Sequence, residues 1–96
     1  MKRAQVLEKL ARSKPTLAAR FGVRDLALFG STVRDAARVD SDIDILVSFE
    51  GPATSERYFG VQFFLEDLLG RPVDLVTDKA LRRELRSSVE QEAVHV

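Results

Sequence analysis

The N-terminal part of the chain has the periodicity of an amphipathic helix. Its apolar residues fall on one side of such a helix, with charged residues around them, at Val6, Leu7, Leu10 and Ala11. Pro15 is expected to interrupt this helix, or to restart it as a further turn or two. Gly22 then ends the helical stretch, because glycine adopts the left-handed conformation common just past a helix C-terminus.

Three apolar segments are predicted to be strands, at residues 23–29, 42–49 and 73–76. The first ends in a run that is apolar on both faces, as in a strand covered on both sides. The second alternates acidic and apolar residues at its start, so both of its aspartates lie on one face. The third carries one aspartate between apolar neighbours.

A longer helix separates the second and third strands. Its apolar positions repeat with helical spacing, at Val61, Phe64, Leu65, Leu68 and Leu69. Thr54 or Ser55 supplies the N-terminal cap, and Gly70 ends the helix. A basic helical segment is expected after Asp78, with Lys79, Arg82, Arg83 and Arg86, while residues 89–96 match no element. The alternation of helices and strands predicts an α/β sheet with helices packed against it.

Composition narrows the classes of protein that this chain can belong to. Its 96 residues are expected to form one domain, residues 1–96, with 45% hydrophobic and 31% charged residues. Fifteen basic and fifteen acidic residues balance, so no overall field favours direct nucleic-acid binding. The chain has no cysteine and one histidine, which excludes thiolate chemistry and argues against a zinc site. No apolar stretch is long enough for a signal peptide or a membrane span, so no membrane association and a cytoplasmic location are expected.

Asp42 and Asp44 are the first candidates for chemistry. Two residues apart on a strand, their carboxylates project from the same face, within reach of one hard cation. Taken alone, an Asp-x-Asp pair is more simply explained as the polar outer face of a half-buried strand.

Three further features favour a metal and phosphate site. Gly30 and Ser31 stand where a buried strand gives way to a helix start, and free N–H groups there receive phosphate oxygens. Ten residues separate Ser31 from Asp42, enough for a short helix and a return to a neighbouring strand. Asp74 lies in another apolar strand, where a buried carboxylate is costly unless a cation compensates it.

These residues resemble a known signature. The string Leu28-Phe29-Gly30-Ser31, ten residues, then Asp42-Ile43-Asp44 is similar to the Gly-Ser-x10-Asp-x-Asp motif of the polymerase-beta-like nucleotidyltransferase superfamily. The resemblance to its minimal branch, the MNT antitoxin partners of HEPN-domain toxins, covers nearly the whole chain. It implies the nucleotidyltransferase fold, an α/β (α+β) arrangement in which helices flank a small mixed β-sheet.

The resemblance also implies an activity. Asp42, Asp44 and Asp74 would be the catalytic and metal-binding residues and hold two Mg²⁺ ions, with Asp74 helping to deprotonate the acceptor. Gly30 and Ser31 would bind the β- and γ-phosphates of ATP. Within this branch AMP passes from ATP to a tyrosine of the cognate HEPN-domain toxin, with which the antitoxin forms a hetero-oligomer.

Arg34 matches an arginine common in the family and is a candidate phosphate contact. An ion pair with Asp35 or Asp40 is the competing interpretation. Ser41 precedes the aspartates as in the family, where it shapes the turn. Asp35 departs from the family, whose members usually carry glycine there, and adds a negative charge near the triphosphate site.

Two alternatives remain open at this stage. A non-catalytic antitoxin would neutralise its partner by binding alone, and Asp35 is the feature that favours it. A metal-dependent nuclease would also cluster carboxylates, but it would not explain Gly30-Ser31, and no lysine stands beside Asp42 or Asp74.

Partner contacts are predicted less directly. Phe59 and Phe63 lie off the apolar stripe of their helix, either exposed to a partner or part of a wider buried face. The basic residues after Asp78 form either a binding patch or a solvated face, and His95 belongs to a tail or a partner contact.

Overall fold

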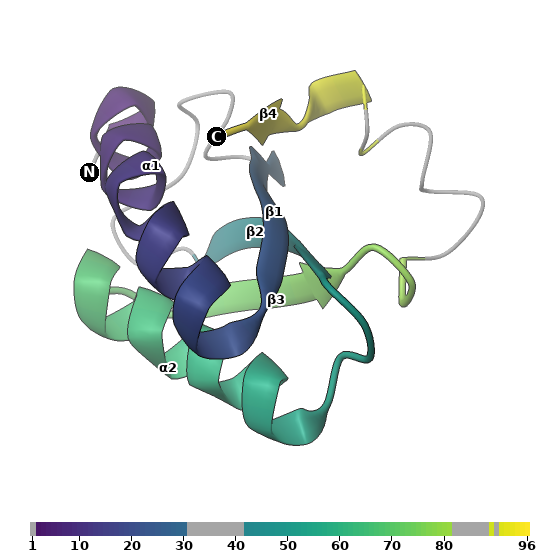
Figure 1. Ribbon diagram of the computed structural model, residues 1–96. Coiled ribbons are helices and arrows are strands. Elements are labelled where there is room, and N and C mark those ends of the chain that lie inside the picture. Colours follow the sequence, from purple (N-terminus) through teal and green to yellow (C-terminus); the bar gives the residue numbers. More distant parts are fainter. Residues whose placement is uncertain (1, 31–41, 82–88, 90) are drawn as a thin grey trace.

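The computed structural model describes residues 2–30, 42–81, 89 and 91–96. Along the chain the elements are α1 (Arg3–Phe21), β1 (Val23–Phe29), β2 (Ile43–Phe49), α2 (Ser55–Leu69), β3 (Val73–Thr77) and β4 (Val94–His95). The strands form one sheet in the order β3-β2-β1-β4 (Figure 1). Strands β2 and β3 are parallel, whereas β1 is antiparallel to both of its neighbours, so the sheet is mixed as expected.

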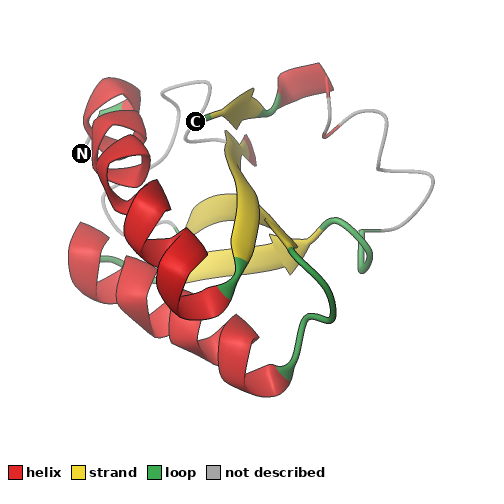
Figure 2. Ribbon diagram, viewed as in Figure 1, coloured by secondary structure: helices red, strands yellow, loops and turns green. Residues whose placement is uncertain are grey.

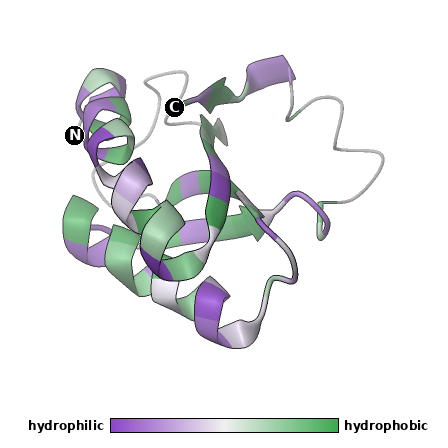
Figure 3. Ribbon diagram, in the orientation of Figure 1, coloured by the Kyte–Doolittle hydropathy of each residue, from purple (hydrophilic) through white to green (hydrophobic). Residues whose placement is uncertain are grey.

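The two helices pack against one face of the sheet and against each other (Figures 1 and 2). Residues on this face of the strands are almost completely buried and join the buried residues of α1 and α2 in one core. Its strand residues are Val23, Leu26, Leu28, Ile43, Ile45, Val47, Phe49, Val73 and Leu75. Figure 3 shows hydrophilic and hydrophobic residues alternating along α1 and along the strands, as expected of elements that bury one face.

Helix α1 corrects the expectation that Pro15 divides it, because the helix runs unbroken through the proline. Pro15 is exposed, so its ring lies on the solvent side, where a helix can bend away from a lost hydrogen bond. Val6 and Leu10 before it and Leu17 after it are fully buried. Packing on both sides of the proline therefore outweighs the cost of about 3 kcal/mol that proline carries inside a helix.

The ends of both helices follow the predicted signals. Gly22 and Gly70 have φ values of 71° and 67° and adopt the left-handed conformation that ends α1 and α2. The Thr54 hydroxyl accepts a hydrogen bond of 3.3 Å from the Arg57 main-chain N–H and caps the start of α2. No helix in the described residues is long and apolar enough to cross a membrane.

Strand β4 was not anticipated from the sequence. Val94 and His95 pair with Leu28 and Ala27 of β1, and the Val96 N–H donates to the Leu26 carbonyl at 3.1 Å. Only the first residues of the basic helix predicted after β3 are among the described residues. Asp78 to Ala80 form a turn, and residues 82–88 lie outside the described residues.

Candidate active site

Strand β1 ends where the main chain turns close to the Asp44 side chain. Gly30 follows the last residue of β1 and has a φ of 73°, a conformation that favours glycine. A Cβ atom at this position would collide with Oδ2 of Asp44 and lie 3.0 Å from its Cγ. The structure thus places the first residue of the predicted phosphate loop against the second aspartate of the motif.

Asp44 and Asp74 are direct neighbours on the parallel strands β2 and β3. Alternation along each strand puts them on the face opposite to Ile43, Ile45 and the other core residues. Because a hydrogen bond between two carboxyl groups needs a proton on one of them, the proximity of Asp74 favours the protonated form of Asp44. The structure therefore assembles two of the three predicted carboxylates.

The surroundings of Asp44 disfavour its charged form. Burial, followed by the charge of Asp74, the hydrogen bond with Asp74 and the charge of Asp42, raises the pKa of Asp44 to about 6. A divalent cation would reverse this effect, because it compensates both the burial and the repulsion.

Asp42 precedes β2 and its side chain is exposed. It influences Asp44 through its charge. Within the part of the chain that the structure describes, no group of three or more histidine, cysteine or acidic side chains is arranged to hold a metal ion. Asp44 and Asp74 nevertheless offer the oxygen ligands that Mg²⁺ prefers, and this ion commonly takes one or two carboxylates together with substrate phosphates.

The other predicted site residues cannot be compared with the structure. Ser31 and Arg34 lie outside the described residues, as do Asp35, Ser41 and the predicted short helix between the glycine and the aspartates. Their assignments as phosphate contacts and turn residues stay predictions.

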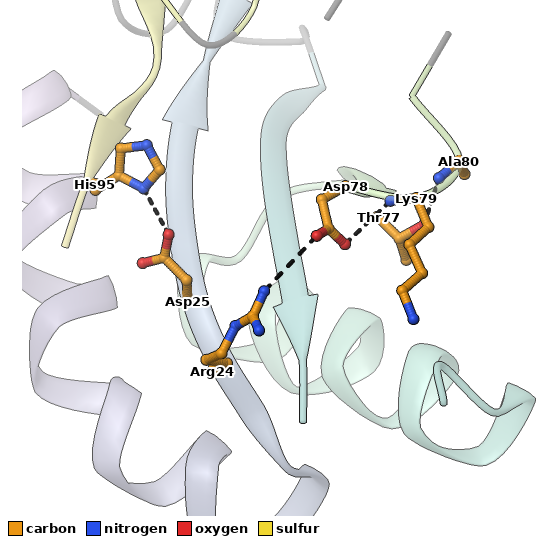
Figure 4. A network of polar contacts seen from close by, with 7 residues as sticks. All are labelled: Arg24, Asp25, Thr77, Asp78, Lys79, Ala80 and His95. Carbon is orange, nitrogen blue, oxygen red and sulfur yellow. Dashed lines mark hydrogen bonds and ion pairs between the residues drawn. The ribbon is translucent and has the colours of Figure 1, made fainter. Parts of the chain in front are cut away.

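Several polar contacts near the sheet were missed by the sequence reasoning. His95 is not a free tail, because its Nδ1 lies 2.7 Å from Oδ2 of Asp25 on β1 (Figure 4). Arg24 reaches across β2 toward Asp78, at 3.9 Å, in the turn after β3. Three polar residues of α2 contact the main chain of β3 around Asp74. Their spacing of four residues, at Tyr58, Gln62 and Glu66, was the signal available in the sequence.

With this geometry established, comparison with known proteins identifies the class. The sequence model of the nucleotidyltransferase domain family matches residues 10–96. The chain therefore belongs to this family, and both its mixed sheet and its paired carboxylates agree with that assignment.

The nearer relatives define the branch. The chain is 42% identical over 87 residues to the protein adenylyltransferase MntA of Thermococcus cleftensis, which covers 91% of this chain and 88% of the relative. A solved structure of a minimal nucleotidyltransferase superposes with a TM-score of 0.82 at 37% identity, covering 98% and 95% of the two chains. The protein is a nucleotidyltransferase of the minimal branch to which these relatives belong.

A more distant structure shares the fold. It is an MNT antitoxin in complex with a tri-AMPylated HEPN toxin of Shewanella oneidensis, with a TM-score of 0.60 and 20% identity, covering 97% of this chain and 66% of that one.

Proposed function

We propose that this nucleotidyltransferase transfers AMP from ATP to a tyrosine hydroxyl of a cognate HEPN-domain toxin and so acts as its antitoxin. The observation that carries the proposal is the juxtaposition of Gly30, Asp44 and Asp74 on one face of the sheet. The 42% identity to a protein adenylyltransferase supports the reaction, and the distant complex with an AMPylated toxin supports the acceptor.

In the reaction, the acceptor oxygen attacks the α-phosphorus and pyrophosphate leaves as the bond to the β-phosphate oxygen breaks. Asp74, the more exposed carboxylate of the pair, takes the proton from the attacking hydroxyl. Gly30 and Ser31 hold the β- and γ-phosphates through main-chain N–H groups and a hydroxyl.

Asp42, Asp44 and Asp74 would hold two Mg²⁺ ions. When bound, such ions neutralise the phosphates and stabilise the departing pyrophosphate. Asp44 has to be ionised for this task, so ion binding is expected to weaken as the pH falls below its raised pKa of about 6.

The test is to incubate the purified protein with Mg²⁺, ATP and the candidate toxin, and then to measure the intact mass of both proteins. We expect the toxin to gain AMP, and we expect Asp42→Asn and Asp44→Asn to abolish the gain while the circular dichroism spectrum is retained. An Asp44→Asn protein that transfers AMP at the normal rate would show that the site is wrongly assigned. A stable complex without any mass change would instead support an antitoxin that acts by binding alone.

A further inference from the structure

Strand β3 forms an edge of the sheet that the structure describes. On its inner side it pairs with β2, and the Pro72 carbonyl accepts a hydrogen bond of 3.0 Å from the Ile43 N–H. In a strand the main-chain groups of successive residues point to alternate sides. Those of Val73 and Leu75 therefore point away from β2 and need other partners.

Helix α2 supplies these partners from its side chains. Oε2 of Glu66 accepts a hydrogen bond from the Val73 N–H at 3.0 Å, and Nε2 of Gln62 donates to the Val73 carbonyl at 3.4 Å. The Tyr58 hydroxyl donates to the Leu75 carbonyl at 2.5 Å. Because the three residues are four positions apart, they lie along one side of α2. We call Tyr58, Gln62 and Glu66 the α2 ladder.

The ladder forms hydrogen bonds with the main chain of Val73 and Leu75, the residues immediately before and after Asp74. The Asp74 side chain is exposed, so side-chain packing does little to hold it. Its direction depends mainly on the main chain of β3, whose inner side is fixed by β2 and whose outer side is bonded to the ladder.

We propose that the α2 ladder is a set of positioning residues that hold the Asp74 carboxylate opposite Asp44, ready to share a cation. The catalytic consequence rests on the proposed function, whereas the effect on cation binding does not. Glu66 is the ladder residue to test first, because its carboxylate is the acceptor of the Val73 N–H.

The experiment compares Glu66→Leu with Glu66→Gln. Leucine removes the acceptor, whereas the Gln Oε1 can still accept the Val73 N–H. Mn²⁺ affinity is measured by electron paramagnetic resonance in the presence of a non-hydrolysable ATP analogue, and hydrogen exchange reports on the Val73 amide. Glu50→Leu is the matched control, since it removes an exposed acidic side chain outside the ladder.

We expect Glu66→Leu to lose protection at the Val73 amide and to bind Mn²⁺ about 10-fold more weakly, as do other proteins that lose a partner behind a metal ligand. Glu66→Gln and Glu50→Leu should bind like the wild type. Where AMP transfer is measurable, kcat should fall in Glu66→Leu with little change in the KM for ATP.

Unchanged Mn²⁺ affinity in a Glu66→Leu protein whose Val73 amide exchanges freely would overturn the proposal, and so would a wild-type protein that binds no Mn²⁺. If Glu66→Leu does not fold, Tyr58→Phe removes one hydroxyl from the ladder, and the same comparison of Mn²⁺ affinity decides. A wild-type protein that binds Mn²⁺ but transfers no AMP would contradict the proposed function alone.

Discussion

Gly30 is the residue at which backbone conformation and active-site geometry meet. Its φ of 73° disfavours any side chain, and a Cβ atom would also collide with the Asp44 carboxylate. Gly70 has a similar φ of 67° but has no atom within 4 Å of the position that a Cβ would take. A substitution at Gly70 therefore introduces backbone strain alone, whereas a substitution at Gly30 also displaces the Asp44 side chain.

We expect Gly30→Ala and Gly70→Ala each to lower the free energy of unfolding by about 1 kcal/mol, the usual cost of a left-handed alanine. In addition, Gly30→Ala should lower AMP transfer by about 100-fold or more, because it displaces a group that has to be placed to within about 1 Å. Equal activity in the two variants would contradict this role of Gly30. Urea unfolding and the mass assay provide both measurements.

The raised pKa of Asp44 leads us to expect that the stability of the fold depends on pH. Its pKa is raised from 3.8 to about 6, so between these values the folded protein retains a proton that the unfolded chain has lost. The free energy of unfolding should therefore fall as pH rises through this window and stay low above it.

Asp44→Asn removes this loss. In metal-free buffer near neutral pH we expect the variant to be more stable than the wild type by about 1 to 2 kcal/mol, allowing for partial exposure of the group. Below about pH 4 the difference should vanish, because the wild-type carboxyl is then protonated in both states. Thermal unfolding across the pH range tests this, with the exposed Asp67→Asn as control; a variant no more stable than wild type at neutral pH contradicts it.

At the level of elements, α2 presents two aromatic rings to solvent. Phe59 and Phe63 are 49% and 65% exposed, and their rings stack with centroids 6.3 Å apart. The exposed Glu56 and Asp67 continue the same side of the helix beyond them at helical spacing. The exposure of both rings decides the sequence-based alternative in favour of an exposed face. Its acidic ends would suit a partner surface that combines apolar and basic residues.

Phe63→Ser is therefore expected to weaken binding of the proposed toxin partner by about 10-fold, since exposed aromatic rings dominate many interfaces. The melting temperature should change little. Phe64→Ser is the matched control, because Phe64 packs against the core and its loss should lower the melting temperature. Calorimetric titration with the toxin would contradict the prediction if Phe63→Ser bound as tightly as wild type.

Some features of the helices and strands could be predicted from the sequence, and others could not. Gly22 and Gly70 gave both helix ends because a glycine C-cap depends on local conformation. The predicted break at Pro15 was wrong, because burial of the residues on both sides stabilises the helix through the proline. A strand of two residues such as β4 has no periodicity to detect, and its formation depends on pairing with β1.

Part of the candidate site could also be predicted, because it depends on local patterns in the sequence. Alternation along β2 placed Asp44 on a definite face, and the motif linked it to Gly30 and Asp74. The parallel register that sets Asp44 beside Asp74 joins residues 30 positions apart, and no local pattern fixes it. Contacts from α2 to the main chain of β3 are equally non-local, so no local pattern marks Glu66 as a partner of β3.

For the whole molecule, Asp25 joins three parts of the chain. Its carboxylate lies 3.6 Å from Nζ of Lys14 on α1 and 2.7 Å from Nδ1 of His95 on β4. Lys14 also donates to the Val96 carbonyl oxygen at 2.7 Å. The last residues are thus fastened to the N-terminal helix and to the central sheet.

We expect Asp25→Ala to lower the free energy of unfolding by about 1 to 2 kcal/mol, because both partners of a half-buried carboxylate are lost. Glu8→Ala removes the exposed pair with Arg12 at 2.8 Å and should cost less than about 0.5 kcal/mol. Equal losses in the two variants, measured by urea unfolding, would show that Asp25 does not link these elements.

The α2 ladder has a consequence beyond the placement of Asp74. An edge strand with free main-chain N–H and C=O groups is a template on which a strand of another molecule can add, and this is a common route to aggregation. Along β3 the Val73 N–H and the Val73 and Leu75 carbonyls are already bonded to α2. The residues proposed to position the carboxylate therefore also make this edge a poor site for intermolecular β-pairing.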